Sequence, residues 1–251
     1  MKNIDFSFIA DLYDTYVTVD NDVDFFKKIA KECNGKCLEL MCGTGRVSIP
    51  LLKQGVNLTC VDYSKDMLNV FSNKARILNI NPEIVCQDVC ELSLREKYKL
   101  IFIPFNSFSE IYDVKKQEIA LNRIYEHLED DGIFICTLYN PAYRQKTADG
   151  QLRHLGVFKI DQTKSLIVSY YNQYDTKNKN VTGLQFYEIY DINNKLIDKR
   201  FLEIRFSLIS KYDFITMAEG AGFKVKDIYG DYYFSPFDET SMYMNFLLNK
   251  I

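Results

Sequence analysis

Three acids lie in or at the ends of three successive apolar runs in the first part of the chain: Glu39, Asp62 and Asp88. A glycine turn with Gly43 and Gly45 directly follows the first of these runs. Only glycine lets a backbone approach a ligand closely, and an acid at the end of the next strand can accept hydrogen bonds from the ribose hydroxyls of an adenosine ligand. A Gly-x-Gly turn alone is equally compatible with a structural turn, so the spaced acids carry the prediction of such a site.

A polar segment follows the fourth apolar run, which closes at Ile103. We expect Asn106 and Ser107 to contact a substrate, because open α/β folds place ligands at the carboxyl ends of their strands. Glu110 closes the segment, and a carboxylate there could take the proton of an amine, which must be neutral to attack. A solvated glutamate at the start of a helix is an equally simple interpretation. Tyr139, after the fifth run, is assigned to the same substrate group.

These residues need strands and helices to bring them together. Apolar runs predict strands over residues 36–41, 56–61, 83–87, 98–103 and 133–138. Between them, apolar residues at helical spacing predict helices over residues 22–32, 47–55, 64–78 and 113–127, and residues 11–16 are expected to form a short covering helix. Strands that alternate with helices predict a parallel sheet.

The periodicity changes after Pro141. Runs of β-branched and aromatic residues, separated by short polar turns, predict antiparallel strands over residues 155–160, 165–174, 183–191 and 195–206. Helical spacing returns after Ser210 and ends at Gly222. Two last strands are predicted over residues 223–229 and 241–249.

Composition narrows the classes of partner. The 251 residues include 34 acids and 31 bases, with a net charge of −3 and no run of five like charges. This balance argues against nucleic acid or an anionic membrane as partner, and a small soluble substrate is expected. Asp5 and Asp11 stand where a secretory signal would be apolar, and no apolar stretch is long enough to span a bilayer, so we expect a cytoplasmic protein. The oligomeric state is left open.

The positions of the cysteines and histidines argue against disulfide bonds and against a metal-binding site. The seven cysteines form no Cys-x-x-Cys pair and lie mostly in apolar runs, where reduced cysteine behaves as a small apolar residue. The two histidines, His127 and His154, have no partners at metal-ligand spacing. We therefore expect neither disulfides nor a metal site.

Three segments together resemble the class I S-adenosylmethionine-dependent methyltransferases. Residues 39–45 read Glu-Leu-Met-Cys-Gly-Thr-Gly, where the family's first motif has an acid followed by Leu-Gly-Cys-Gly-Thr-Gly. Residues 61–68 resemble its second motif, and residues 128–134 resemble the motif that opens its fifth strand. Met41 departs from the family, which often has glycine at that position.

The resemblance implies an α/β fold with a Rossmann-like, doubly wound, mostly parallel seven-stranded sheet. It implies that residues 1–140 and 207–251 form the methyltransferase domain that binds S-adenosylmethionine, its last two strands completing the sheet as an antiparallel hairpin. Residues 141–206 resemble the inserted β-sheet of small-molecule enzymes such as amino-sugar and glycine N-methyltransferases, and are expected to form a substrate lid.

The resemblance also implies roles for individual residues. Gly43 and Gly45 would admit the methionyl part of the donor, Asp62 would bind the ribose, and Asp88 with the Val89 amide would read the adenine amino edge. Further donor contacts are assigned to Tyr13, Glu39, Met41, Tyr63, Met67 and Pro104. The residues alone leave simpler interpretations open: Asp62 as a helix cap, Asp88 as a turn acid, and Met67 and Tyr13 as core residues.

We therefore expect a methyltransferase that acts on a small acceptor, with nitrogen preferred over oxygen or sulfur and the acceptor itself unidentified. One alternative is a nicotinamide-dependent oxidoreductase, because Gly43, Gly45 and Ser48 come within one residue of the dinucleotide fingerprint. Another is a non-catalytic protein of the same fold. The run from Asn140 to Tyr143 resembles the Asn-Pro-x-Tyr motif of adenine-modifying DNA methyltransferases, but it follows the fifth strand instead of the fourth.

Overall fold

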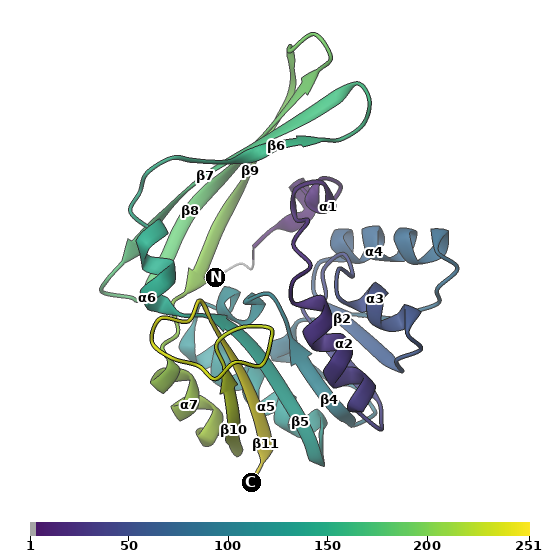
Figure 1. The fold of residues 1–251 in the computed structure, drawn as a ribbon, viewed down its shortest axis with the longest axis vertical. Coiled ribbons are helices and arrows are strands. Elements are labelled where there is room, and N and C mark those ends of the chain that lie inside the picture. Colours follow the sequence, from purple (N-terminus) through teal and green to yellow (C-terminus); the bar gives the residue numbers. More distant parts are fainter. Residues whose placement is uncertain (1–3) are drawn as a thin grey trace.

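A seven-stranded sheet forms the centre of the computed structural model, which describes residues 4–251 (Figure 1). Its strands, in the spatial order β10-β11-β5-β4-β1-β2-β3, are β1 (Cys37–Leu40), β2 (Leu58–Asp62), β3 (Glu83–Cys86), β4 (Tyr98–Ile103), β5 (Leu128–Tyr139), β10 (Phe223–Tyr229) and β11 (Tyr243–Lys250). β1 to β5 pair in parallel, whereas β11 runs antiparallel to both β5 and β10. The predicted Rossmann-like sheet with its closing hairpin is confirmed.

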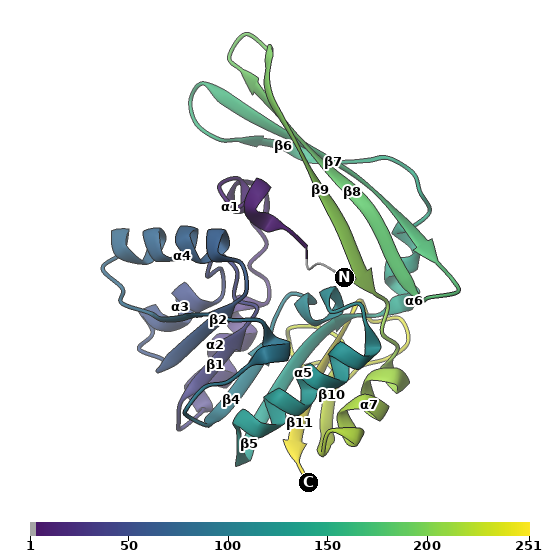
Figure 2. The same ribbon diagram turned by 180° about the vertical axis from the view of Figure 1, so that it is seen from behind.

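Helices cover both faces of this sheet (Figures 1 and 2). The apolar faces of α2 (Val23–Glu32), α3 (Ser48–Lys53) and α4 (Lys65–Ile77) pack into one buried cluster with residues of β1, β2 and β4. Those of α5 (Val114–His127) and α7 (Lys211–Gly220) pack into a second cluster on the other face. Ser64 caps α4 and Ser210 caps α7, as polar N-cap residues do. No helix in the described part of the chain is long and apolar enough to cross a membrane.

Two elements differ from the sequence prediction. β5 begins at Leu128 instead of residue 133, because buried Leu128 already pairs with Tyr98 and a register shift after Tyr98 then realigns the ladder. The expected helix over residues 11–16 is a single turn, α1 (Tyr13–Tyr16).

A second sheet of four antiparallel strands follows β5. It consists of β6 (Arg153–Lys159), β7 (Lys164–Asp175), β8 (Asn180–Asp191) and β9 (Leu196–Ser207), close to the predicted ranges. Figure 1 shows this sheet standing over the edge of the seven-stranded sheet at which β5 ends. Short helix α6 (Pro141–Arg144) lies between β5 and the insert. The division of the chain at residues 140 and 207 stays a prediction.

Residues 4–16, called here the N-terminal segment, lie between the two sheets (Figure 1). On one side, Ile9 and Leu12 join the apolar cluster of the four-stranded sheet, and the Tyr16 hydroxyl lies 2.9 Å from that of Tyr187. On the other side, the Asp14 carboxylate accepts a hydrogen bond of 2.6 Å from the Thr44 hydroxyl. The segment therefore joins the glycine turn after β1 to the insert.

Candidate functional site

Two neighbouring cavities open where the parallel strands end. The first, called here the strand-end cavity, has a volume of about 220 Å³ and lies at the carboxyl ends of β1, β2 and β3. The second, the inter-sheet cavity, measures about 300 Å³ and lies between the N-terminal segment, the loop after β4 and the four-stranded sheet. The strand-end cavity brings together six residues predicted from the sequence, namely Met41, Asp62, Tyr63, Asp88, Val89 and Glu110. The inter-sheet cavity brings together Tyr13, Asn106, Tyr139 and again Glu110.

Asp62, the last residue of β2, holds the glycine turn through a side-chain hydrogen bond. Its Oδ2 accepts a hydrogen bond of 2.8 Å from the Gly43 amide, and its Oδ1 accepts one of 2.8 Å from the Ser64 amide. Burial raises the pKa of Asp62, and these amide donors oppose the shift. Because each carboxylate oxygen has two acceptor sites, both oxygens can also accept from a ligand hydroxyl. The N-cap of α4 is Ser64, so Asp62 is not needed for that role.

The turn itself uses left-handed backbone at Met41, Gly43 and Gly45, with φ of 58°, 55° and 78°. A Cβ on Gly45 would lie 2.4 Å from the ring of Phe71, so this glycine permits α4 to pack against the turn. Among the described residues, a Cβ on Gly43 would meet the Met67 methyl alone, at 3.4 Å. Met41 holds a conformation that costs a non-glycine residue about 1 kcal/mol. Glycine, which the resembling family often has at this position, would avoid this cost.

Several predicted donor residues do not border the strand-end cavity. Glu39 is 1% exposed, and its carboxylate accepts a hydrogen bond of 2.6 Å from the Ser48 hydroxyl. Burial raises the pKa of Glu39 to about 8. Met67 and Pro104 are buried beside the site, and Ser107 borders neither cavity. The contacts assigned to these residues, and to Gly43 and Gly45, stay predictions.

The loop after β4 is held in a defined shape by Asn106. Its amide oxygen accepts a hydrogen bond of 2.8 Å from the Tyr139 amide, and its Nδ2 donates one of 2.6 Å to the Ser109 hydroxyl. Phe105 and Asn106 both adopt left-handed backbone, at φ of 58° and 63°. Asn106 therefore fixes the wall of the inter-sheet cavity, and its carboxamide is already engaged within the protein.

Glu110 stands at the junction of the two cavities and lines both. Its side chain is half-buried, and no hydrogen-bond partner for its carboxyl group is found within residues 4–251. Burial, with a smaller contribution from the Asp62 carboxylate, raises the pKa of Glu110 to about 8. A carboxyl group with this pKa can accept and release a proton near neutral pH.

The structure adds cavity residues that the sequence interpretation missed. Tyr112 lines the strand-end cavity, and its hydroxyl is buried without a hydrogen-bond partner in the described residues. Gln87, Cys90 and Lys116 line the same cavity. Arg144 and Gln185 line the inter-sheet cavity. Gln87 and Cys90 lie within two residues of Asp88, so their proximity to that acid was a usable signal. Arg144 and Gln185 follow no recognisable spacing.

The sequence is similar to those of known methyltransferases. The family described as "Methyltransferase domain" matches residues 37–132. The cypemycin N-terminal methyltransferase of a Streptomyces species is 24% identical over 85% of this chain and 82% of its own length. The glycine/sarcosine N-methyltransferase of Aphanothece halophytica is 29% identical over 52% of this chain and 50% of its own. The chain spans about half the length of the first curated relatives that it matches.

Similarity of fold extends over the whole chain. The CcbJ methyltransferase from Streptomyces caelestis superposes with a TM-score of 0.82 and 21% identity, covering 100% of this chain and 99% of that one. The family resemblance seen in the sequence is thus confirmed. Residues 37–132 match the methyltransferase domain family, and the chain has the class I fold of the S-adenosylmethionine-dependent methyltransferases.

Proposed function

We propose that this protein transfers a methyl group from S-adenosylmethionine to the nitrogen of a small soluble acceptor. Two curated relatives support nitrogen as the target, because their names describe an N-terminal methyltransferase and an N-methyltransferase. S-adenosylmethionine supplies a methyl group that is already activated, so the protein has to hold donor and acceptor in line and exclude water.

The strand-end cavity fits this donor. Asp62 offers acceptor sites for ribose hydroxyls beside a turn of left-handed backbone, and Tyr63 and Met41 supply apolar surface next to it. Asp88 and Val89 lie at the end of β3, where the family resemblance assigns the adenine. The Asp88 carboxylate already accepts a hydrogen bond of 2.8 Å from the Cys90 amide, which fixes its orientation.

The position of Glu110 carries the proposal. It borders the cavity that fits the donor and the cavity that adjoins it, which is where an acceptor nitrogen must lie for in-line attack. An amine arrives at neutral pH mostly as ammonium and has to lose a proton before it can attack. Glu110 is the acid available at that junction, and its pKa of about 8 suits proton transfer from an ammonium group.

The other parts of the site then have defined roles. Asn106 holds the loop that carries Glu110, and Tyr13 and Tyr16 form an aromatic wall beside it, where ring faces attract cations. The four-stranded sheet covers the inter-sheet cavity and would serve as a lid over the acceptor.

Turnover with a panel of small amines, alcohols and thiols tests this function. S-adenosylhomocysteine release and mass spectrometry of the product report transfer and its site. We expect methylated nitrogen. Methylation of oxygen or sulfur alone would overturn the choice of nitrogen. Donor binding without turnover on a broad panel would favour the non-catalytic alternative, and tighter binding of a nicotinamide dinucleotide than of S-adenosylmethionine would favour the oxidoreductase.

A further inference from the structure

Among residues 4–251, the lining of the inter-sheet cavity includes one cation, Arg144, and one acid, Glu110, and is otherwise aromatic, aliphatic or uncharged polar. Arg144 is the last residue of α6 and is half-buried. Its guanidinium lies 5.5 Å from the ring centroid of Tyr139 and 5.0 Å from that of Phe206. Stacking on two rings holds the charge at the cavity wall.

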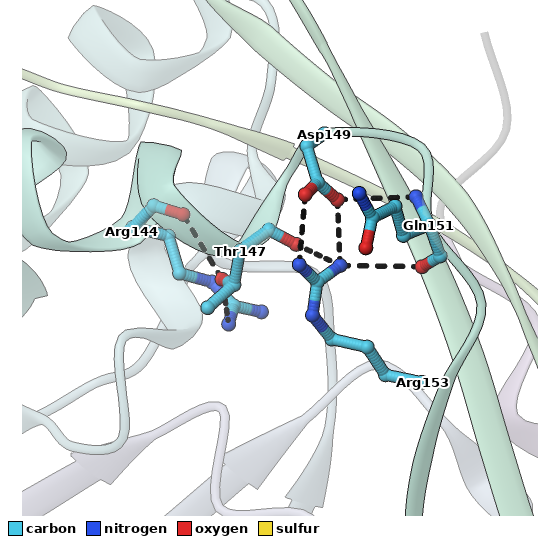
Figure 3. A network of polar contacts seen from close by, with 5 residues as sticks. All are labelled: Arg144, Thr147, Asp149, Gln151 and Arg153. Atoms are coloured by element: carbon cyan, nitrogen blue, oxygen red, sulfur yellow. Dashed lines mark hydrogen bonds and ion pairs between the residues drawn. The ribbon is translucent and has the colours of Figure 1, made fainter.

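Within residues 4–251, Arg144 has no carboxylate partner of the kind that a half-buried guanidinium usually has. One hydrogen bond, of 3.3 Å, joins its Nη1 to the Thr147 hydroxyl, and no carboxylate within residues 4–251 forms an ion pair with it. Nearby Arg153 is different, since Asp149 binds it through two hydrogen bonds of 2.6 and 2.9 Å. Figure 3 shows the two arginines on either side of Thr147, with only Arg153 facing a carboxylate.

The rest of α6 is built to keep Arg144 in place. Asn140 is 5% exposed, caps α6 by accepting from the Ala142 amide at 3.1 Å, and donates to the backbone carbonyls of Glu239 and Ser241. The Thr147 hydroxyl also donates to the Arg144 carbonyl, at 3.0 Å. The Asn140–Tyr143 run therefore anchors a helix. The side-chain amide of Asn140 is fully engaged in these hydrogen bonds.

A fixed guanidinium that lines a cavity and has no counter-ion within residues 4–251 matches the planar oxygen pairs of a carboxylate or phosphate. We propose that Arg144 binds an anionic group of the acceptor, so that the acceptor is an amine that also carries a carboxylate or a phosphate. This inference rests on the proposed function, with the amine beside Glu110 and the anionic group at Arg144. Arg144 is then the residue that determines which amines are accepted.

Matched acceptor pairs test the inference. Glycine with glycinamide probes a carboxylate, and glucosamine 6-phosphate with glucosamine probes a phosphate. KM and kcat are measured for each, and binding is measured separately by calorimetry on protein saturated with S-adenosylhomocysteine. We compare the wild type with Arg144→Met, Arg144→Lys and, as the matched control, Arg153→Met.

In the wild type we expect at least one anionic probe to bind about tenfold or more tightly than its neutral partner, as charge-assisted bidentate bonds require. Arg144→Met should remove this preference mainly through KM, Arg144→Lys should restore part of it, and Arg153→Met should retain it. Which of the two pairs shows the preference identifies the anionic group. The inference is overturned if neither anionic probe is preferred, or if Arg144→Met weakens anionic and neutral probes equally.

Binding separates this inference from the function on which it rests. A glycolate and glycolamide pair, which has no amine, is titrated in the same way. A preference for glycolate that Arg144→Met abolishes upholds the anion site even if no amine is methylated. Methylation of amines without any preference for an anion upholds the proposed function and overturns the site at Arg144.

Discussion

The two cavities are built in different ways. Apart from Ile4, the described lining of the strand-end cavity comes from residues 41–116, a stretch that lies within the methyltransferase domain match. The inter-sheet cavity takes its lining from the N-terminal region, the β4 loop, the end of β5 with α6, and the four-stranded sheet. Only its β4-loop residues lie within that match. The strand-end cavity, our proposed donor site, is thus lined almost entirely by one continuous stretch of the chain, whereas the inter-sheet cavity, our proposed acceptor site, is assembled from segments far apart in the sequence.

The two cavities also differ in the charge of their linings. The strand-end cavity is lined by several charged residues, namely Asp62, Asp88, Asp113 and Lys116, whereas aromatic and aliphatic side chains dominate the inter-sheet cavity. Glu110 is common to both. If the donor binds in the strand-end cavity and the acceptor in the inter-sheet cavity, as proposed, each cavity contacts a different substrate. Substitutions on the two sides should therefore alter different kinetic constants.

The largest effect is expected at Glu110, where the two regions meet. Glu110→Gln should lower turnover by about a hundredfold, because it removes a general base, and it should leave donor affinity largely unchanged. Since the pKa of Glu110 is about 8, its carboxylate fraction rises through that pH, and wild-type kcat/KM should rise with it. In Glu110→Gln, kcat/KM should lose the rise that titration of Glu110 causes. It should keep only the rise that comes from deprotonation of the amine itself. Normal turnover at every pH would remove Glu110 from catalysis.

A donor-side substitution should act on donor binding alone. Asp62→Ala is expected to weaken S-adenosylmethionine binding by about 1.5–3 kcal/mol, because charge-assisted hydrogen bonds are lost. Ser64→Ala is the matched control: it removes the cap of α4, costs about 1 kcal/mol of stability and leaves the Asp62 carboxylate in place. Calorimetry and thermal unfolding of both variants separate the two roles. Equal donor affinity in the two variants would assign Asp62 to structure only.

A substitution at Glu39 tests whether this acid contributes to donor binding, as proposed for Asp62, or only to stability. Its pKa is raised from 4.5 to about 8, so between these values the unfolded chain releases a proton that the folded protein keeps. The free energy of unfolding must therefore fall as the pH rises through this window, by about 1.4 kcal/mol for each unit of pKa difference at most. Glu39→Gln should flatten this dependence with little change in donor affinity. A loss of donor affinity as large as that of Asp62→Ala would show that Glu39 acts on the ligand.

The smallest effect is expected on the acceptor side, at the contact between Tyr16 and Tyr187. Tyr16→Phe removes one hydrogen bond, worth about 1 kcal/mol, and should raise the KM of the acceptor a few-fold while the Kd of the donor stays constant. Tyr190→Phe is a suitable control, because the Tyr190 hydroxyl bonds Glu188 within the same sheet and lines neither cavity. A rise in donor Kd for Tyr16→Phe would contradict the separation of the two regions.

The sequence was informative where structure depends on local pattern. Strand ends, helix caps and the acid at residue 62 follow from periodicity and spacing over short distances, and the structure bears out the elements that carry them. It could not show that Gly45 is needed by Phe71, or that Glu39 is turned toward Ser48. These are packing relations between elements. The same limit hid Arg144, which forms no ion pair with a carboxylate within residues 4–251 and which we propose as an anion site.

The position of β11 bears on how the chain folds. Tyr243 of β11 pairs with Tyr139 of β5, and the whole insert and α7 lie between these residues in the sequence. Neighbouring strands of the insert can pair as soon as each hairpin exists. One edge of β5 pairs with β4, but its other edge depends on a distant partner, and such long-range pairing is slow. Until β11 docks, the apolar residues Phe134, Cys136 and Leu138 belong to an unprotected strand edge, which is a surface prone to aggregation. Recovery of active protein on refolding should thus be limited by a strand that touches neither cavity.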